Sequence, residues 1–192
     1  MLVKKEIDFK EVLRRWAIGE IGSKEFGLPD FKEERKKLKS NQFTETDLEK
    51  CLYRRWTCYI PTIAQLNAVW FLKPTKFIIN EFPKFYTMND NGWKQKTNGS
   101  YRLIDAIFRS MNYPDENSRE FKIIRNFENL DIDDFTGITL IYNKIIKKYI
   151  IVEGHARLIA IYNHLVINKR KIRLPLEFAI GITNNKWYFS PF

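Results

Sequence analysis

The chain has 192 residues, of which 44% are hydrophobic and 15% aromatic, so it can bury a core and is not a disordered protein. Its formal net charge of +10 favours anionic partners such as nucleic acid or nucleotides, although a Lys-rich surface without such a partner fits the same value. Two cysteines seven residues apart exclude a disulfide framework, and the sequence shows neither a signal-peptide pattern nor a membrane-length apolar run, so we expect a cytoplasmic protein without a membrane partner.

The first part of the chain shows the pattern of successive helices. Asp8 precedes apolar residues at helical spacing, and Glu11 three positions later completes a capping-box pattern. The segments that follow are a charged surface helix at residues 30–39, a helix capped by Thr44 or Thr46, and a helix opened by Pro61. We therefore expect residues 1–75 to form a mostly helical region packed on the remainder.

The middle of the chain alternates between short elements and turn-rich segments. Residues 76–82 favour a strand, whereas residues 87–99 are rich in Asn, Asp and Gly and favour a surface loop. Ser100 is expected to cap an amphipathic helix that runs to Met111, and a short helix is expected after Ser118.

From Leu130 onward the hydrophobic period changes to that of strands. Residues 138–142 and 147–153 predict two strands joined by a hairpin turn, residues 155–166 a buried helix, residues 174–182 a strand, and residues 186–189 an edge strand. The predicted fold class is α+β, with a mixed-sheet α/β core at residues 76–192, an insertion loop at 87–99, and a helical N-terminal half.

The segment Glu153-Gly154-His155-Ala156-Arg157 stands where an apolar strand meets the start of a helix. The first turn of a helix has free N–H groups and a partial positive charge, and a glycine allows close approach of a ligand. These residues therefore predict a phosphate-binding site, because helix N-termini bind phosphates in this way.

This segment, with its preceding strands and following helix and strand, resembles the core of the ParB/sulfiredoxin-like superfamily over residues 130–182. Gly154, His155 and Arg157 match the Asp-Gly-His-His-Arg box of the kinase-like branch, while Glu153 replaces the Asp and Ala156 the second His. Two arginines of the partition-protein box and the sulfiredoxin cysteine are missing, which argues against CTP-dependent clamping and sulfiredoxin chemistry. The resemblance implies a small α/β domain with nucleotide phosphates at the start of this helix.

Roles for the site residues follow from their chemistry. We expect Gly154, His155, Ala156 and Arg157 to bind nucleotide phosphates, with Arg157 as a bidentate donor. Glu153 and His155 are the candidate catalytic acid and base, and Glu153 is the candidate Mg²⁺ ligand. The plainer alternatives are a helix-capping Glu153, a structural His155 and an ion-paired Arg157.

A second set of residues suits contact with nucleic acid. The basic connector Lys169-Arg170-Lys171, with Arg173, is a candidate for binding a phosphate backbone, and so are Lys94 and Lys96 in the predicted loop. Trp93, between these two lysines, is the best candidate for an exposed ring that stacks on a base. A solvated turn is the alternative interpretation of the connector.

Two functions remain open from the sequence. The first is a ParB-like nucleotide-binding protein that carries out phosphotransfer or nucleotide hydrolysis, as a kinase or NTPase, using a nucleoside di- or triphosphate with Mg²⁺. The alternative is a non-enzymatic DNA-binding or regulatory protein of phage or mobile-element type, on a ParB-like scaffold. Two further possibilities remain open: the protein could form a homodimer, or it could be a protein-interaction subunit that uses exposed aromatic residues.

Overall fold

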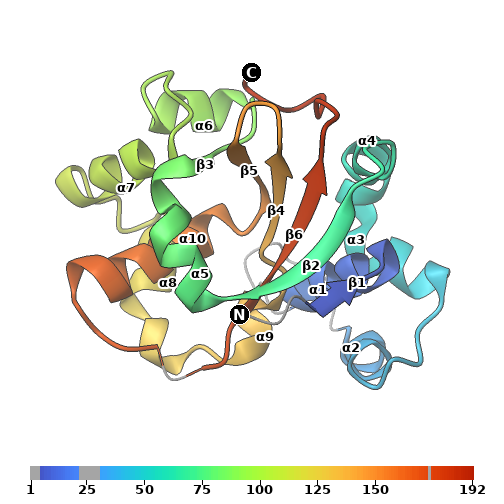
Figure 1. Ribbon diagram of the computed structural model, residues 1–192. Coiled ribbons are helices and arrows are strands. Elements are labelled where there is room, and N and C mark those ends of the chain that lie inside the picture. The colour runs from blue at the N-terminus through green and yellow to red at the C-terminus, as the bar shows by residue number, and fades with distance from the viewer. Residues whose placement is uncertain (1–4, 22–30, 173) are drawn as a thin grey trace.

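The computed structural model describes residues 5–21, 31–172 and 174–192, and they form an α+β fold around one mixed sheet (Figure 1). The strands of the sheet are β1 (Lys5–Ile7), β2 (Val69–Pro74), β3 (Phe85–Tyr86), β4 (Thr139–Asn143), β5 (Lys148–Glu153) and β6 (Glu177–Thr183). The helices are α1 (Phe9–Ile21), α2 (Lys32–Lys39), α3 (Glu45–Cys58), α4 (Ile60–Ala64), α5 (Thr75–Glu81), α6 (Asn91–Lys96), α7 (Leu103–Asn112), α8 (Arg119–Arg125), α9 (Ile132–Thr136) and α10 (His155–Tyr162). Short 3₁₀ turns η2 (Phe82–Lys84) and η3 (Phe127–Asn129) and the π-helical turn η4 (Asn163–Ile167) complete the set.

The strand order is β1-β2-β6-β4-β5-β3, so strands from the start, middle and end of the chain share one sheet. The predicted hairpin is confirmed: β4 and β5 pair antiparallel, and the side chain of Asn143 accepts the N–H groups of Ile145 and Ile146 in the turn. Strand β6 lies between β2, to which it is antiparallel, and β4, to which it is parallel. The expected N-terminal region and the expected core are therefore joined by β1 and β2.

The core lies on both faces of the sheet, because alternate residues of each strand point to opposite sides. Ile150 and Val152 of β5 pack in the cluster that includes α1, α3 and α4, whereas Tyr149 and Ile151 pack in the cluster that includes α7 and α10. In Figure 1 the two groups of helices flank the central strands. The C-terminal helix is buried as predicted, since α10 supplies Leu158 to the second cluster.

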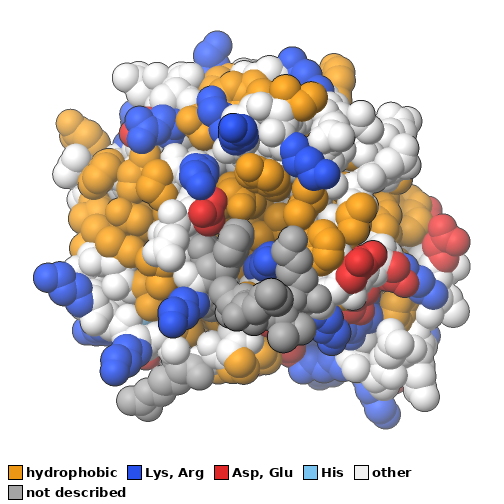
Figure 2. All heavy atoms as spheres, viewed as in Figure 1, with side chains coloured by type: hydrophobic (Ala, Val, Ile, Leu, Met, Phe, Trp, Pro, Cys, Tyr) orange, Lys and Arg blue, Asp and Glu red, His pale blue; other side chains and the backbone are white. Residues whose placement is uncertain are grey.

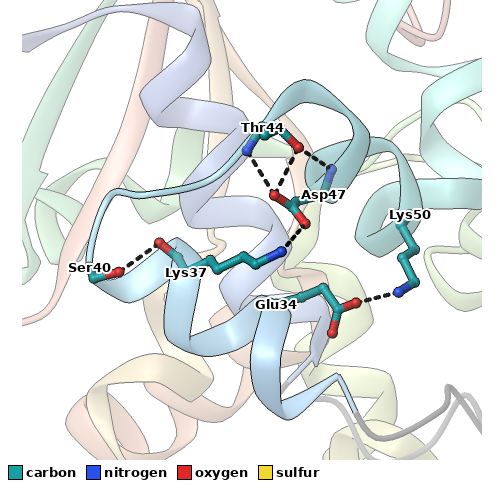
Figure 3. Close-up of polar contacts among 6 residues, drawn as sticks. All are labelled: Glu34, Lys37, Ser40, Thr44, Asp47 and Lys50. Atoms are coloured by element: carbon teal, nitrogen blue, oxygen red, sulfur yellow. Dashed lines mark hydrogen bonds and ion pairs between the residues drawn. The ribbon is translucent and has the colours of Figure 1, made fainter.

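The α2–α3 corner illustrates how local sequence sets the helix boundaries (Figure 3). Thr44, rather than Thr46, is the N-cap of α3: its hydroxyl accepts the N–H of Asp47 at 3.2 Å, and Asp47 accepts the N–H of Thr44 at 2.8 Å. Lys37 of α2 binds the same carboxylate at 3.1 Å, and Lys50 of α3 pairs with Glu34 of α2. The hydrogen bonds that Asp47 accepts from Thr44 and Lys37 lower the pKa of its carboxyl group to about 2.

Two expected elements are wrong in type. Residues 76–82, expected as a strand, form α5 and η2, while the strand is β2 just before them, where alternate residues Trp70 and Leu72 are buried. The expected loop at 87–99 contains α6, because Asp90 caps it by accepting the N–H groups of Gly92 and Trp93. Pairing with β6 makes residues 69–74 the strand, and the Asp90 cap starts a helix in the expected loop. In both places this hydrogen bonding outweighs local composition.

Two smaller expectations also change. Residues 186–189 are not a strand, since Trp187 turns inward and donates its Nε1–H to the Thr62 hydroxyl at 2.9 Å. Arg102, not Ser100, is the N-cap of α7, and Ser100 instead accepts the N–H of Arg102 and donates to Asp105. The helix expected after Ser118 is confirmed as α8, with Ser118 as its N-cap.

Across the described ranges, no helix combines the length and the apolarity needed to span a membrane.

Candidate functional site

The predicted junction of strand, glycine and helix is confirmed at residues 153–155. Strand β5 ends at Glu153, and Gly154 is the N-cap of α10 with a φ of +93°. A Cβ at this position would lie 2.7 Å from Cγ1 of Ile138, so the left-handed backbone and the close neighbour both require glycine. Gly154 thereby places the first turn of α10, in which backbone N–H groups lack helical partners, at the end of the central hairpin.

A cavity of about 700 Å³ lies over this junction. Its floor is the β5–α10 corner, and its walls come from the C-terminal end of α3 and from α6, α7 and α8. The charged residues in its lining are Arg55, Lys96, Arg109, Arg119 and Arg157 together with Asp90, Asp115, Glu120 and Glu153. The aromatic lining residues are Tyr59, Trp93 and Tyr113. The cavity therefore combines cationic and aromatic groups around a helix N-terminus.

Glu153 is buried, and both of its carboxylate oxygens are engaged. Oε2 accepts a hydrogen bond from Nη2 of Arg55 at 2.8 Å, and Oε1 accepts the N–H of Gly154 at 3.0 Å. Burial favours the neutral acid, but the positive charges of Arg55 and Arg157 outweigh it and lower the pKa of Glu153. Arg55 also lies 3.4 Å from Glu20, so it joins α1, α3 and β5.

Glu153 is also the residue that the sequence predicts as a Mg²⁺ ligand. Among the residues that the structure describes, no group of three or more His, Cys, Asp or Glu side chains is placed for metal binding. Arg55 and the Gly154 N–H each bind one of the carboxylate oxygens of Glu153, and its Mg²⁺ role stays a prediction of the sequence.

His155 is 7% exposed and stacks on Trp93, with ring centroids 4.4 Å apart and an interplanar angle of 17°. Its Nε2 is buried and has no hydrogen-bond partner in the described structure. Burial lowers the pKa of His155 to about 3, although the charge of Glu153 opposes the shift. The imidazole is therefore neutral at pH 7, and the acid or base role of His155 stays a prediction of the sequence.

Arg157 is 4% exposed, and its guanidinium is turned toward α1. Nη2 donates to the carbonyl oxygen of Gly19 at 2.8 Å, in the last turn of α1, where carbonyl groups lack helical partners. A Cβ on Gly19 or Gly137 would lie 3.2 or 3.3 Å from Nη1, so two glycines make room for the side chain. One arm of the guanidinium expected to bind phosphate therefore caps α1 instead.

The sequence interpretation missed several lining residues. Arg55 belongs to no motif of the sequence, yet it is part-buried between Glu153 and Glu20. Arg109 and Tyr113 reach the cavity from the end of α7, and Arg119 from the start of α8. The Ser118 capping signal marks the beginning of α8, but no local pattern indicates that this helix faces α10. Trp93, proposed for base stacking, does lie in the cavity wall.

The residues expected to bind nucleic acid do not form one face. Lys94 and Lys96 lie on α6, where Lys96 lines the cavity, whereas the exposed connector Lys169–Lys171 follows η4, about 20 Å of helical rise from Gly154. Lys96 is paired with Glu120 and Arg170 with Glu128, and Arg173 lies outside the described residues. On the face shown in Figure 2, Lys and Arg side chains are spread among hydrophobic ones instead of forming a single patch.

Comparison with protein families, with curated proteins and with solved structures finds no significant match to this chain. The resemblance to the ParB/sulfiredoxin-like superfamily therefore remains a prediction from the residues of the motif.

Proposed function

We propose that the cavity binds a nucleotide, with its phosphates at the start of α10. The observation that supports this most strongly is the buried Nε2 of His155, which lies in the cavity wall without a hydrogen-bond partner in the described structure. A buried polar atom of this kind costs about 1–3 kcal/mol when unpaired, and a ligand oxygen beside it would remove that cost. The free N–H groups of the first turn of α10 are suited to the same ligand.

The surrounding charges support an anionic ligand. Arg109 is exposed at the rim on the last turn of α7, and Arg119 begins α8 on the opposite wall. The deeper carboxylate of Glu153 is compensated by Arg55, so it does not leave an uncompensated negative charge beneath the ligand. Tyr59 and Tyr113 add aromatic surface of the kind that stacks on a nucleobase.

The proposal concerns binding and includes no reaction. Glu153 is held by Arg55, and burial lowers the pKa of His155 to about 3, which makes its imidazole a weak base, so the proposal assigns no proton transfer to either residue. Phosphotransfer and hydrolysis, like the DNA-binding alternative, remain predictions of the sequence.

A thermal-shift panel of ATP, ADP, CTP and GTP, each with and without Mg²⁺, tests the proposal. At a ligand concentration of a hundred times Kd, the melting temperature should rise by roughly 5–10 °C. Isothermal titration calorimetry on the nucleotide with the largest shift then gives the affinity. If no nucleotide changes the melting temperature or gives a calorimetric signal, the proposal is wrong.

A matched pair of variants locates the site. Arg109→Glu places a negative charge at the cavity rim and should weaken binding by roughly tenfold or more. Arg125→Glu is the control, because Arg125 is also an exposed arginine in the last turn of a helix but does not line the cavity. Equal affinities in the two variants would place the nucleotide elsewhere.

A further inference from the structure

One wall of the cavity is packed less firmly than the others. None of the six residues of α6 is buried, whereas α3, α7 and α10 each contribute buried side chains to the core. Trp93 is the residue through which α6 contacts the two core clusters, and it does so while half-buried. Segments with few buried apolar contacts open at low free-energy cost.

The segment around α6 is also built as a unit with a narrow base. The N–H of Thr87 donates to the carbonyl oxygen of Tyr101 at 2.7 Å, so the two ends of residues 88–100 meet. Within the unit, Gly99 donates its N–H to the carbonyl oxygen of Lys94, and the Thr97 hydroxyl donates to that of Trp93. These internal hydrogen bonds can persist while the unit moves about its base.

Two side-chain contacts hold α6 itself against the body of the protein, while the start of the segment is fixed by Met88, which is buried in the core, and by the Asn89 N–H, which donates to the Phe189 carbonyl oxygen at 2.7 Å. Trp93 covers His155, and Lys96 pairs with Glu120 of α8. In this closed arrangement Nε2 of His155 is sealed from solvent without a hydrogen-bond partner in the described structure. Displacement of α6 would give that atom access to water or to a ligand.

We propose that residues 90–99 form a hinged lid over His155 and the first turn of α10, with Met88 and Asn89 in its fixed base. Trp93 is its latch, and opening of the lid admits a ligand to the start of the helix. The identity of that ligand rests on the proposed function, but the motion itself is tested without any ligand, so the two proposals fail separately.

Modification of histidine by diethyl pyrocarbonate tests the lid in the protein alone. The chain has two histidines, and both are buried under an aromatic ring at an interplanar angle of 17°: His155 under Trp93 and His164 under Phe127. We expect His155 to react faster than His164 in the wild-type protein. Trp93→Ala should raise the rate at His155 by roughly five- to tenfold and leave His164 unchanged.

Trp93→Phe is the conservative control and should keep the rate at His155 near the wild-type value, because it retains a ring over the imidazole. Hydrogen exchange of the wild-type protein gives a second measurement that no folding defect can obscure: amides of α6 should exchange faster than those of α7. Equal reactivity of the two histidines in both the wild type and Trp93→Ala would overturn the lid, and so would equal protection of α6 and α7.

Discussion

The helical segment formed by α10 and the following turn η4 carries the two histidines of the chain, one near each end, in similar ring environments but with different polar surroundings. At the C-terminal end, His164 stacks on Phe127 at 4.2 Å, its Nε2 lies 3.4 Å from the Lys171 carbonyl oxygen, and its Nδ1 lies 3.9 Å from the Glu128 carboxylate. At the N-terminal end, His155 stacks on Trp93 at 4.4 Å, and its Nε2 has no partner in the described part of the chain.

This difference distinguishes a structural histidine from a candidate binding residue. Burial and stacking are common to both rings, so neither property identifies a site. The unpaired nitrogen, the cavity and the helix N-terminus occur together at His155. Other buried side-chain nitrogens of the described residues also lack a partner, among them Nε1 of Trp16, so it is the coincidence with the cavity and the helix start that marks His155.

The largest expected effect contrasts Arg157, in the first turn of α10, with Arg170, in the connector that follows η4. Arg157→Ala removes the cap on Gly19 and a buried positive charge near Glu153, so it should lower the free energy of unfolding by about 3–5 kcal/mol. Arg170→Ala, which removes an exposed arginine paired with exposed Glu128, should change it by less than about 0.5 kcal/mol. Urea denaturation measures both. Similar values for the two variants would mean that Arg157 is not a structural residue.

The next effect tests the backbone that opens the site. Gly154→Ala forces a side chain into a left-handed conformation and against Ile138, and should cost about 3 kcal/mol of stability. Gly99→Ala is the matched control, since its φ is +81° but a Cβ there meets no atom within 4 Å, so only the backbone cost of about 1 kcal/mol remains. Chemical denaturation of the two variants should separate the cost of the left-handed backbone from the cost of the steric clash with Ile138. Equal losses in the free energy of unfolding would exclude the Ile138 contact as a cause.

The smallest of the three effects depends on pH. Because burial lowers the pKa of His155 from 6.5 to about 3, the unfolded chain binds a proton at this residue before the folded protein does. The contribution of His155 to stability therefore decreases as pH falls below about 6.5, by about 2 kcal/mol between pH 7 and pH 5. His155→Gln should lack this part of the pH dependence when the two proteins are unfolded in urea across that range. An imidazole NMR titration with a midpoint near 6.5 would contradict the prediction.

The sequence predicts the elements of residues 138–182 well because their signals are local. The hairpin, the glycine junction and α10 follow from strand period, turn residues and helical spacing, and Ser118 and Thr44 mark helix starts by capping. The α6 helix was missed because a short polar segment carries no hydrophobic period, and only the Asp90 cap reveals it.

The arrangement of the site could be predicted only in part. The motif identifies Glu153, Gly154 and His155 as neighbours at a helix start, and the cavity does lie there. That Arg157 would cap Gly19 and that Arg55 would bind Glu153 depends on contacts between residues about a hundred positions or more apart. Such pairings are set by tertiary packing, which no single-sequence pattern encodes.

The position of β6 in the sheet has a consequence for how the chain folds. This strand follows all the other described strands in sequence, yet it lies between β2 and β4 and pairs with both. Until it is in place, β2 and β4 each present an unpaired edge, and the β1–β2 pair has no sheet to join. Contacts of such long sequence separation slow folding. During synthesis, the complete sheet against which the first helices pack forms only after the last strand has been made. A chain that stops before β6 should therefore remain prone to aggregate through these two open edges.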